Sequence, residues 1–271
     1  PEALLWAGEL RYQQANFTAA ANFYNRLLDE YPDSDLTDEA EYKLGWSLLK
    51  QQEKQEALEH FLVAAGEASD PQVAADARLQ AGYILMNNKE YEQAIKVLEP
   101  ASTVDNPQAP SVMHLLAQAH LANNQAPMAI PTLERLTEQY PDYPHRNRAR
   151  LRLARAYADT GELGEARRIL NALRDSENQT ISAEATLELA SMMEDAGDTQ
   201  KALRLYLRTA EEAPSDELVA QALYAAGAAY EKMRDIDQAV EAYERLVEEY
   251  SDQQPWAGQA AVRLEALTEG E

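Results

Sequence analysis

The chain of 271 residues contains no cysteine. Disulfides, thiolate metal sites and thiol nucleophiles are therefore excluded, and the redox compartment cannot be inferred from cysteine chemistry. Only ten glycines and three phenylalanines are present, whereas 45% of the residues are hydrophobic. Because alanine and leucine dominate that fraction, helix is the favoured state throughout the chain.

Basic residues and long hydrophobic runs are also scarce. The 24 lysines and arginines face 47 acidic residues, which gives a net charge of -23. The longest apolar runs, such as Ala225 to Tyr230, fall far short of the roughly 18 residues that a membrane helix needs. Because the negative charge repels phosphate and anionic lipid, we expect no nucleic-acid partner and no direct membrane insertion. The sequence begins at Pro1 inside a helical pattern, so we expect it to come from a longer protein.

A repeat of 35 to 37 residues organises the chain. Each repeat has a small residue in a helical context, an alanine twelve positions later and a large apolar residue after four more. The small residues are Gly8, Gly45, Gly82, Ala117, Ala154, Ala190 and Gly227. The large residues are Tyr24, Phe61, Leu98, Leu133, Leu170, Tyr206 and Tyr243.

Each repeat reads as a helical hairpin, with two amphipathic stretches of about 13 residues around a short polar break. The small residues let the two helices approach closely, and we expect the large residue to fill the space between one hairpin and the next. Pro32, Pro141 and Pro214 are expected just beyond the ends of second helices, because proline cannot continue a helix.

The pattern resembles the tetratricopeptide repeat along almost the whole chain. In the first repeat the residues on or next to the signature positions are Leu4, Ala7, Gly8, Tyr12, Ala20, Tyr24, Leu27 and Pro32. The resemblance implies an all-α fold, an α-solenoid of about seven hairpins wound as a right-handed superhelix, with first helices on its concave face. The units lie near 1–37, 38–74, 75–109, 110–146, 147–182, 183–219 and 220–252. Departures exist, since alanine replaces the small glycine in three units.

We expect residues 1–271 to form a single solenoid without a second domain. Residues 255–268 read as one more amphipathic helix, which caps the open end. Prolines at Pro100 and Pro110 predict an interrupted second helix in the third unit and a hinge at residues 100–110.

Two repeats end in Tyr-Pro, at residues 28–32 and 137–141, and this ending narrows the resemblance to a subgroup of the family. They are similar to bacterial cell-envelope proteins of this family, namely the lipoprotein of the outer-membrane barrel assembly machine and the periplasmic coordinator of cell division. This similarity implies a periplasmic rather than a cytoplasmic location and a partner in the cell envelope.

The sequence shows no catalytic or cofactor motif. His60, His114, His120 and His145 lack metal-ligand spacing, and no nucleophile motif or phosphate-binding glycine loop is present. We expect no metal site, no cofactor and no enzyme activity. His114 and His120 are six residues apart and point to different sides of one helix, so we expect them on the surface or along the groove.

Aromatic and apolar residues occupy first-helix positions that the resemblance places on the concave face. The candidates for partner binding are Tyr12, Tyr42, Trp46, Leu79, Tyr83 and Met86. Large rigid rings on a surface are common anchors for a peptide or helix. The alternative is that superhelix curvature buries these rings between neighbouring first helices.

A basic stripe forms a second candidate. Between residues 144 and 175, eight arginines against four acidic residues give a net charge of +4. Arg148, Arg152 and Arg155 follow helical spacing and could grip an acidic side chain or a terminal carboxylate. Alternatively, Arg148–Glu184 and Arg152–Glu188 ion pairs neutralise the stripe. The Lys and Asn pattern with which cytosolic co-chaperones of this family clamp a carboxylate is missing.

These observations predict a non-catalytic protein–protein interaction scaffold that binds a peptide or helix of an envelope partner on its concave face. The alternative is a ligand-responsive regulator, or an accessory domain of a larger enzyme, in which residues 100–110 act as the hinge.

Overall fold

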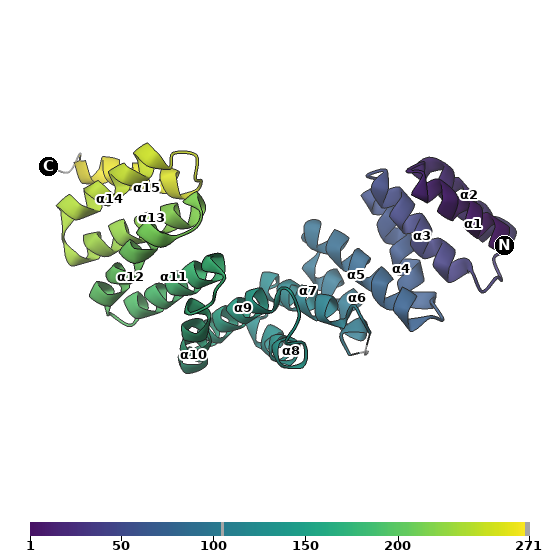
Figure 1. The fold of residues 1–271 in the computed structure, drawn as a ribbon, viewed down its shortest axis with the longest axis horizontal. Coiled ribbons are helices and arrows are strands. Elements are labelled where there is room, and N and C mark those ends of the chain that lie inside the picture. The colour runs from purple at the N-terminus through teal and green to yellow at the C-terminus, as the bar shows by residue number, and fades with distance from the viewer. Residues whose placement is uncertain (104–105, 269–271) are drawn as a thin grey trace. The chain divides into compact units, whose positions relative to one another are not determined.

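The computed structural model describes residues 1–103 and 106–268, and within them every regular element is a helix (Figure 1). The helices are α1 (Glu2–Gln13), α2 (Phe17–Glu30), α3 (Thr37–Lys50), α4 (Lys54–Glu67), α5 (Pro71–Asn87), α6 (Tyr91–Ser102), α7 (Ala109–Ala122), α8 (Ala126–Gln139), α9 (Arg146–Asp159), α10 (Leu163–Arg174), α11 (Gln179–Asp195), α12 (Thr199–Glu212), α13 (Asp216–Met233), α14 (Ile236–Glu249) and α15 (Trp256–Thr268). The all-α solenoid fold class is confirmed. Among the described residues, none of these helices is both long and apolar enough to cross a membrane.

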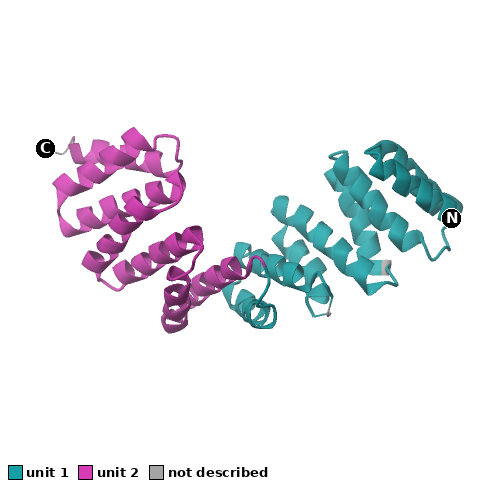
Figure 2. Ribbon diagram, in the orientation of Figure 1, with its two compact units in different colours: residues 1–143 teal, residues 144–271 magenta. Residues whose placement is uncertain are grey.

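The helices form two compact units, Pro1–Tyr143 with α1 to α8 and Pro144–Glu271 with α9 to α15 (Figure 2). Within each unit, every helix packs against the next one along the chain, and first helices of successive hairpins also touch. Odd-numbered helices α1 to α13 are first helices of hairpins, and even-numbered helices are second helices. The single solenoid over 1–271 stays a prediction, because each unit is defined by its own internal contacts.

A left-handed residue closes the first helix of all seven hairpins. The residues with positive φ are Ala15, Gln52, Lys89, Asn124, Gly161, Gly197 and Arg234. The next amide donates to the carbonyl five residues earlier, as in Asn16 to Arg11 at 2.9 Å and Asp235 to Tyr230 at 3.0 Å. This is the six-to-one hydrogen bond of a Schellman helix end. Five of the seven positions carry a side chain, so glycine marks only the turns at Gly161 and Gly197 in the sequence.

Close contact between the small and the large signature residue holds each glycine-containing hairpin together. A Cβ atom at Gly8 would lie 2.4 Å from the Tyr24 ring, and one at Gly227 would lie 2.5 Å from the Tyr243 ring. Both rings are buried. The large residue thus packs on the first helix of its own hairpin. It also lies beside the next hairpin, since Tyr24 lines a pocket with Tyr42 and Trp46 of α3.

Three prolines lie beyond helix ends, as predicted. A fourth lies inside a helix that was predicted to be interrupted. Pro32, Pro141 and Pro214 lie two residues beyond the last residue of the second helices α2, α8 and α12. The predicted interruption of the third unit's second helix is wrong, because α6 continues through Pro100 to Ser102. Pro100 lies in the last turn, and the helix ends two residues after it. The predicted hinge at 100–110 includes residues 104 and 105, which lie outside the described residues.

Candidate partner-binding site

First helices of unit 1 bring three of the predicted aromatic residues to one pocket. Tyr12 on α1 and Tyr42 and Trp46 on α3 line a pocket of about 260 Å³, together with Glu9, Tyr24, Lys43 and Lys50. The three rings are partly buried and pack against the hydrophobic core. They are therefore neither fully exposed on the groove nor fully buried between first helices. We call this site the aromatic pocket.

Helix α5 carries the other three predicted residues, which do not line the aromatic pocket. Tyr83 is 44% exposed, and Met86 is partly buried against the core. Leu79 is only 5% exposed and belongs to the core itself. Its side chain packs in the core beneath the surface. This corrects the prediction that Leu79 faces a partner.

Edge-to-face ring contacts fix the aromatic pocket. The Trp46 ring centroid lies 6.4 Å from that of Tyr42 and 5.9 Å from that of Phe61, with interplanar angles of 88° and 84°. Phe61 on α4 is fully buried and also lies 5.9 Å from Tyr42. Lys50 places its Nζ atom 5.9 Å from the Trp46 ring centre, in a cation–π contact. Such edge-to-face geometry is favourable and holds the rings in a preformed arrangement.

A carboxylate–ammonium pair lies at the edge of the aromatic pocket. Lys43 Nζ is 2.7 Å from Glu9 and 3.5 Å from Glu39. The hydrogen bond from Lys43 lowers the pKa of Glu9. Burial opposes the charge on Lys43, but its hydrogen bond and attraction to Glu9 outweigh burial and raise the pKa of the lysine. Burial raises the pKa of Tyr42. Glu9 and Lys43 are therefore both charged at neutral pH.

A second pocket adjoins the Glu9–Lys43 pair and contains a tryptophan that the repeat pattern did not single out. Its volume is about 450 Å³, and Leu5, Trp6 and Leu36 supply its apolar wall. Trp6 is 73% exposed. The sequence contained a signal for this tryptophan. Trp6 lies two residues before Gly8, and the same position in two other repeats holds the charged residues Arg152 and Glu188. A tryptophan with this much of its side chain exposed indicates a contact surface.

Tyr24, at the base of the aromatic pocket, lacks the hydrogen bond that its counterparts make. Its hydroxyl is buried, and no described residue accepts from it within hydrogen-bond geometry. Burial, and then the charge of nearby Glu9, raise the pKa of Tyr24 well above its ordinary value. Glu9 thus acts on this hydroxyl mainly through its charge, while its carboxylate accepts hydrogen bonds from Lys43 and Gln13.

At the equivalent position in unit 2, each tyrosine hydroxyl donates to a glutamate on the first helix of its hairpin. Tyr206 donates to Glu194 at 3.0 Å, and Tyr243 donates to Glu231 at 2.7 Å. Both glutamates lie four residues after the small signature residue. In the first hairpin that position holds Tyr12, which supplies no carboxylate.

This difference predicts opposite effects of removing the hydroxyl. Tyr243→Phe should lower the free energy of unfolding by about 1.5 kcal/mol or more, because a hydrogen bond to a carboxylate is lost. Tyr24→Phe should leave it unchanged within about 0.5 kcal/mol, since an unpaired buried hydroxyl contributes no favourable hydrogen bond. Urea denaturation followed by circular dichroism measures both. Equal losses in the two variants would contradict the assigned hydrogen bonds.

The basic stripe on α9 is paired with acidic residues of α11. Arg148 forms an ion pair with Glu184, as the alternative interpretation predicts. Glu188 is paired with Arg155, at 2.6 Å, where the spacing predicts Arg152. Arg152 also interacts with a neighbouring group. These partly exposed pairs contribute at most about 1 kcal/mol each. They nevertheless reduce the positive charge that the stripe offers to a partner.

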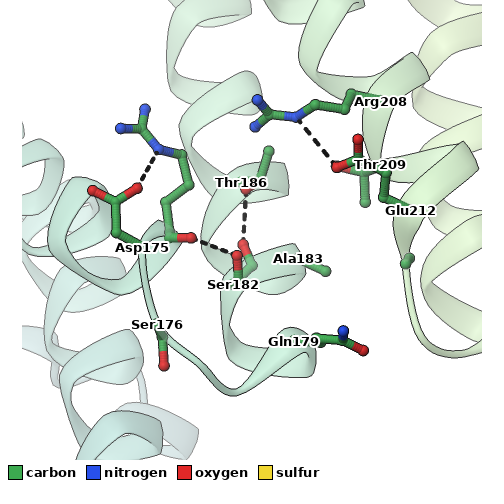
Figure 3. Close-up of a pocket in the computed structure, with 11 residues that line it drawn as sticks. Asp175, Ser176, Gln179, Ser182, Ala183, Thr186, Arg208, Thr209 and Glu212 are labelled. Carbon is green, nitrogen blue, oxygen red and sulfur yellow. Dashed lines mark hydrogen bonds and ion pairs between the residues drawn. The ribbon is translucent and has the colours of Figure 1, made fainter.

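A third pocket, of about 480 Å³, lies in unit 2 between α10, α11 and α12 (Figure 3). Its Arg208 side chain points to Glu212, at 3.9 Å, and Arg174 pairs with Asp175 at 3.3 Å. The hydroxyls of Ser182 and Thr186 donate to backbone carbonyl oxygens. Because these polar groups already have partners in the chain, they bind a ligand only at the cost of existing contacts.

Two histidines lie inside unit 1, which corrects their expected place on the surface or groove. His114 and His120 are each 6% exposed. The His114 Nδ1 atom is 3.1 Å from the Tyr143 hydroxyl, and the His120 Nδ1 atom is 2.9 Å from Gln125 Oε1. Among the residues that the structure describes, no three histidine, aspartate or glutamate side chains gather as a metal site.

Comparison with protein families matches three segments of the chain. Residues 105–269 match a "Tetratricopeptide repeat-like domain", and residues 2–34 and 42–110 match "Tetratricopeptide repeat" families. A search of curated proteins finds no sequence match.

Solved structures match the fold over most of the chain. The C-terminal part of a TPR repeat-containing protein from Cytophaga hutchinsonii is 15% identical, with a TM-score of 0.66 over 94% of this chain and 96% of that one. A tetratricopeptide repeat protein from Parabacteroides merdae is also 15% identical, with a TM-score of 0.59 over 98% of both chains. The apo quorum sensor NprR from B. thuringiensis is 12% identical, with a TM-score of 0.65 over 98% of this chain and 80% of that one. At these identities the likeness concerns the fold.

Proposed function

The chain belongs to the tetratricopeptide repeat family, and from this premise we propose that it is a non-catalytic scaffold that binds a segment of a partner protein in the aromatic pocket. The family supports a protein–protein interaction role in general terms. The occupant of the pocket is a peptide or helix whose apolar side chains contact Tyr12, Tyr42 and Trp46.

The observation that carries this proposal is the preformed, partly exposed ring cluster over a fully buried Phe61. Rings that serve only the core gain most by complete burial, yet Tyr12, Tyr42 and Trp46 all line an open pocket. Because ring contacts already hold them, little conformational entropy is lost when a partner binds. Tryptophan and tyrosine in such a setting are the residue types that dominate binding energy at interfaces.

We further propose that the partner is a bacterial envelope protein and that the chain works in the periplasm. The support is the Tyr-Pro ending of repeats at Tyr31 and Tyr140, each of which directly follows a second helix. The regulator alternative has no specific observation in its favour, since the likeness to the quorum sensor concerns the fold.

Photo-crosslinked capture from fractionated cells of the source organism tests the scaffold and its location. The bait carries a crosslinker beside the aromatic pocket, in wild-type, Trp46→Ala and Tyr31→Ala forms. Tyr31 is a matched exposed aromatic residue outside this pocket. We expect an envelope protein that wild type and Tyr31→Ala recover and Trp46→Ala loses. Recovery of cytosolic proteins alone would contradict the location, and equal recovery by all three baits would contradict the site.

A further inference from the structure

In the sixth hairpin, the signature tyrosine forms a cluster with a glutamate and a lysine. The first hairpin has the tyrosine and the lysine of this cluster. In the sixth hairpin, Glu194 accepts from Tyr206 and from Lys232 of the next first helix. Lys232 lies five residues after Gly227, and Lys50 lies five residues after Gly45. Tyr24 and Lys50 thus occupy the places of Tyr206 and Lys232, and both line the aromatic pocket.

The third group, a carboxylate at the position of Glu194, is missing from the first hairpin, and the nearby carboxylate of Glu9 is paired with Lys43. The place of Glu194 is taken by Tyr12, whose ring packs edge-on against Phe17 at 5.2 Å between centroids. Tyr24 is left as a buried hydroxyl without an acceptor at the base of the pocket. A buried polar group of this kind is costly unless something satisfies it.

One lysine of the aromatic pocket offers a positive charge to an anion, although the chain as a whole carries -23 and Lys43 already lies near both Glu9 and Glu39. Lys43 and Lys50 face the single carboxylate of Glu9 among the pocket residues. Lys43 is paired with Glu9, whereas Lys50 contacts the Trp46 ring and forms no ion pair with a described residue. One positive charge therefore stays without a carboxylate.

We propose that the aromatic pocket binds a glutamate side chain of the partner, whose carboxylate accepts from the Tyr24 hydroxyl and pairs with Lys50. This inference rests on the proposed function and names the chemistry of its site. The partner's carboxylate takes the role that Glu194 has in unit 2, and the rings of Tyr12 and Trp46 contact the methylene groups. Because the hydroxyl is shielded from solvent, Glu9 must move aside from Lys43 to admit the ligand.

Binding of a small capped amino acid tests this proposal without any partner. The probe is N-acetyl-glutamate N-methylamide, and its matched control is the corresponding glutamine compound. The readout is the indole N–H signal of Trp46 in nuclear magnetic resonance titrations. For wild type we expect a saturable shift with the glutamate compound and at least about tenfold weaker binding of the glutamine compound, since a charge-assisted hydrogen bond is lost.

Variants assign the effect to the proposed groups. Tyr24→Phe should weaken binding of the glutamate compound about tenfold, and Lys50→Gln should weaken it as well. Tyr206→Phe is the matched control and should bind like wild type, because its carboxylate is already in place. Glu9→Gln should bind more tightly, since it removes the competing carboxylate. Absence of a saturable shift, equal binding of the two compounds, or unchanged binding by Tyr24→Phe would overturn the proposal.

The same variants separate this proposal from the scaffold function. Loss of the captured partner with Trp46→Ala, but not with Tyr24→Phe, would retain the scaffold and reject the glutamate site. Saturable binding of the glutamate compound without any partner loss in Trp46→Ala would retain the site and reject its use as the partner surface.

Discussion

Phe61→Ala is expected to lower the free energy of unfolding by about 3 to 5 kcal/mol, the range for truncation of a fully buried aromatic side chain. Phe61 lies against Gly45 on α3, where a Cβ atom would be 2.9 Å from its ring. It also supports Tyr42 and Trp46 from below. The substitution therefore opens a cavity between α3 and α4 and removes the support of the aromatic pocket.

Leu62→Ala is the matched control for this prediction. Leu62 is the next residue on α4 and is exposed, so its truncation should cost less than about 1 kcal/mol. Urea denaturation followed by circular dichroism compares the two variants. A loss in Phe61→Ala no larger than that in Leu62→Ala would show that the second hairpin does not depend on this contact.

The repeat made the fold predictable from sequence, because each hairpin must bury its apolar side against the next. What the repeat could not show was the partner of each large residue. Tyr24 and Gly8 are sixteen residues apart, and spacing alone does not tell whether the ring lies within its hairpin or against the next one. The turns were also hidden, since Ala15 and Arg234 adopt left-handed conformations that are usually signalled by glycine.

Part of the candidate site followed from residue type and register, and part required the structure. Register placed Tyr12, Tyr42 and Trp46 on one face, and the structure brings them to one pocket. Depth of burial was not predictable, because Leu79 occupies an equivalent register and lies in the core. The unpaired Tyr24 hydroxyl emerged only by comparison with Tyr206, whose partner on the neighbouring helix the structure identifies.

Trp46→Ala should weaken partner binding by about 30-fold or more while the chain stays folded. This is the size of effect expected for a tryptophan at the centre of an interface, which contributes about 2 kcal/mol or more. Trp46→Leu should give a smaller loss, because leucine retains part of the apolar contact with Phe61 and Tyr42. Helicity measured by circular dichroism should match wild type in both variants.

The most direct test of the account is the dissociation constant of a captured partner segment, measured by titration calorimetry with wild type, Trp46→Ala and Tyr31→Ala. We predict a loss of about 30-fold or more for Trp46→Ala and a constant within about twofold of wild type for Tyr31→Ala. An unchanged constant in Trp46→Ala, or a loss that appears only together with lost helicity, would contradict a partner site at the aromatic pocket.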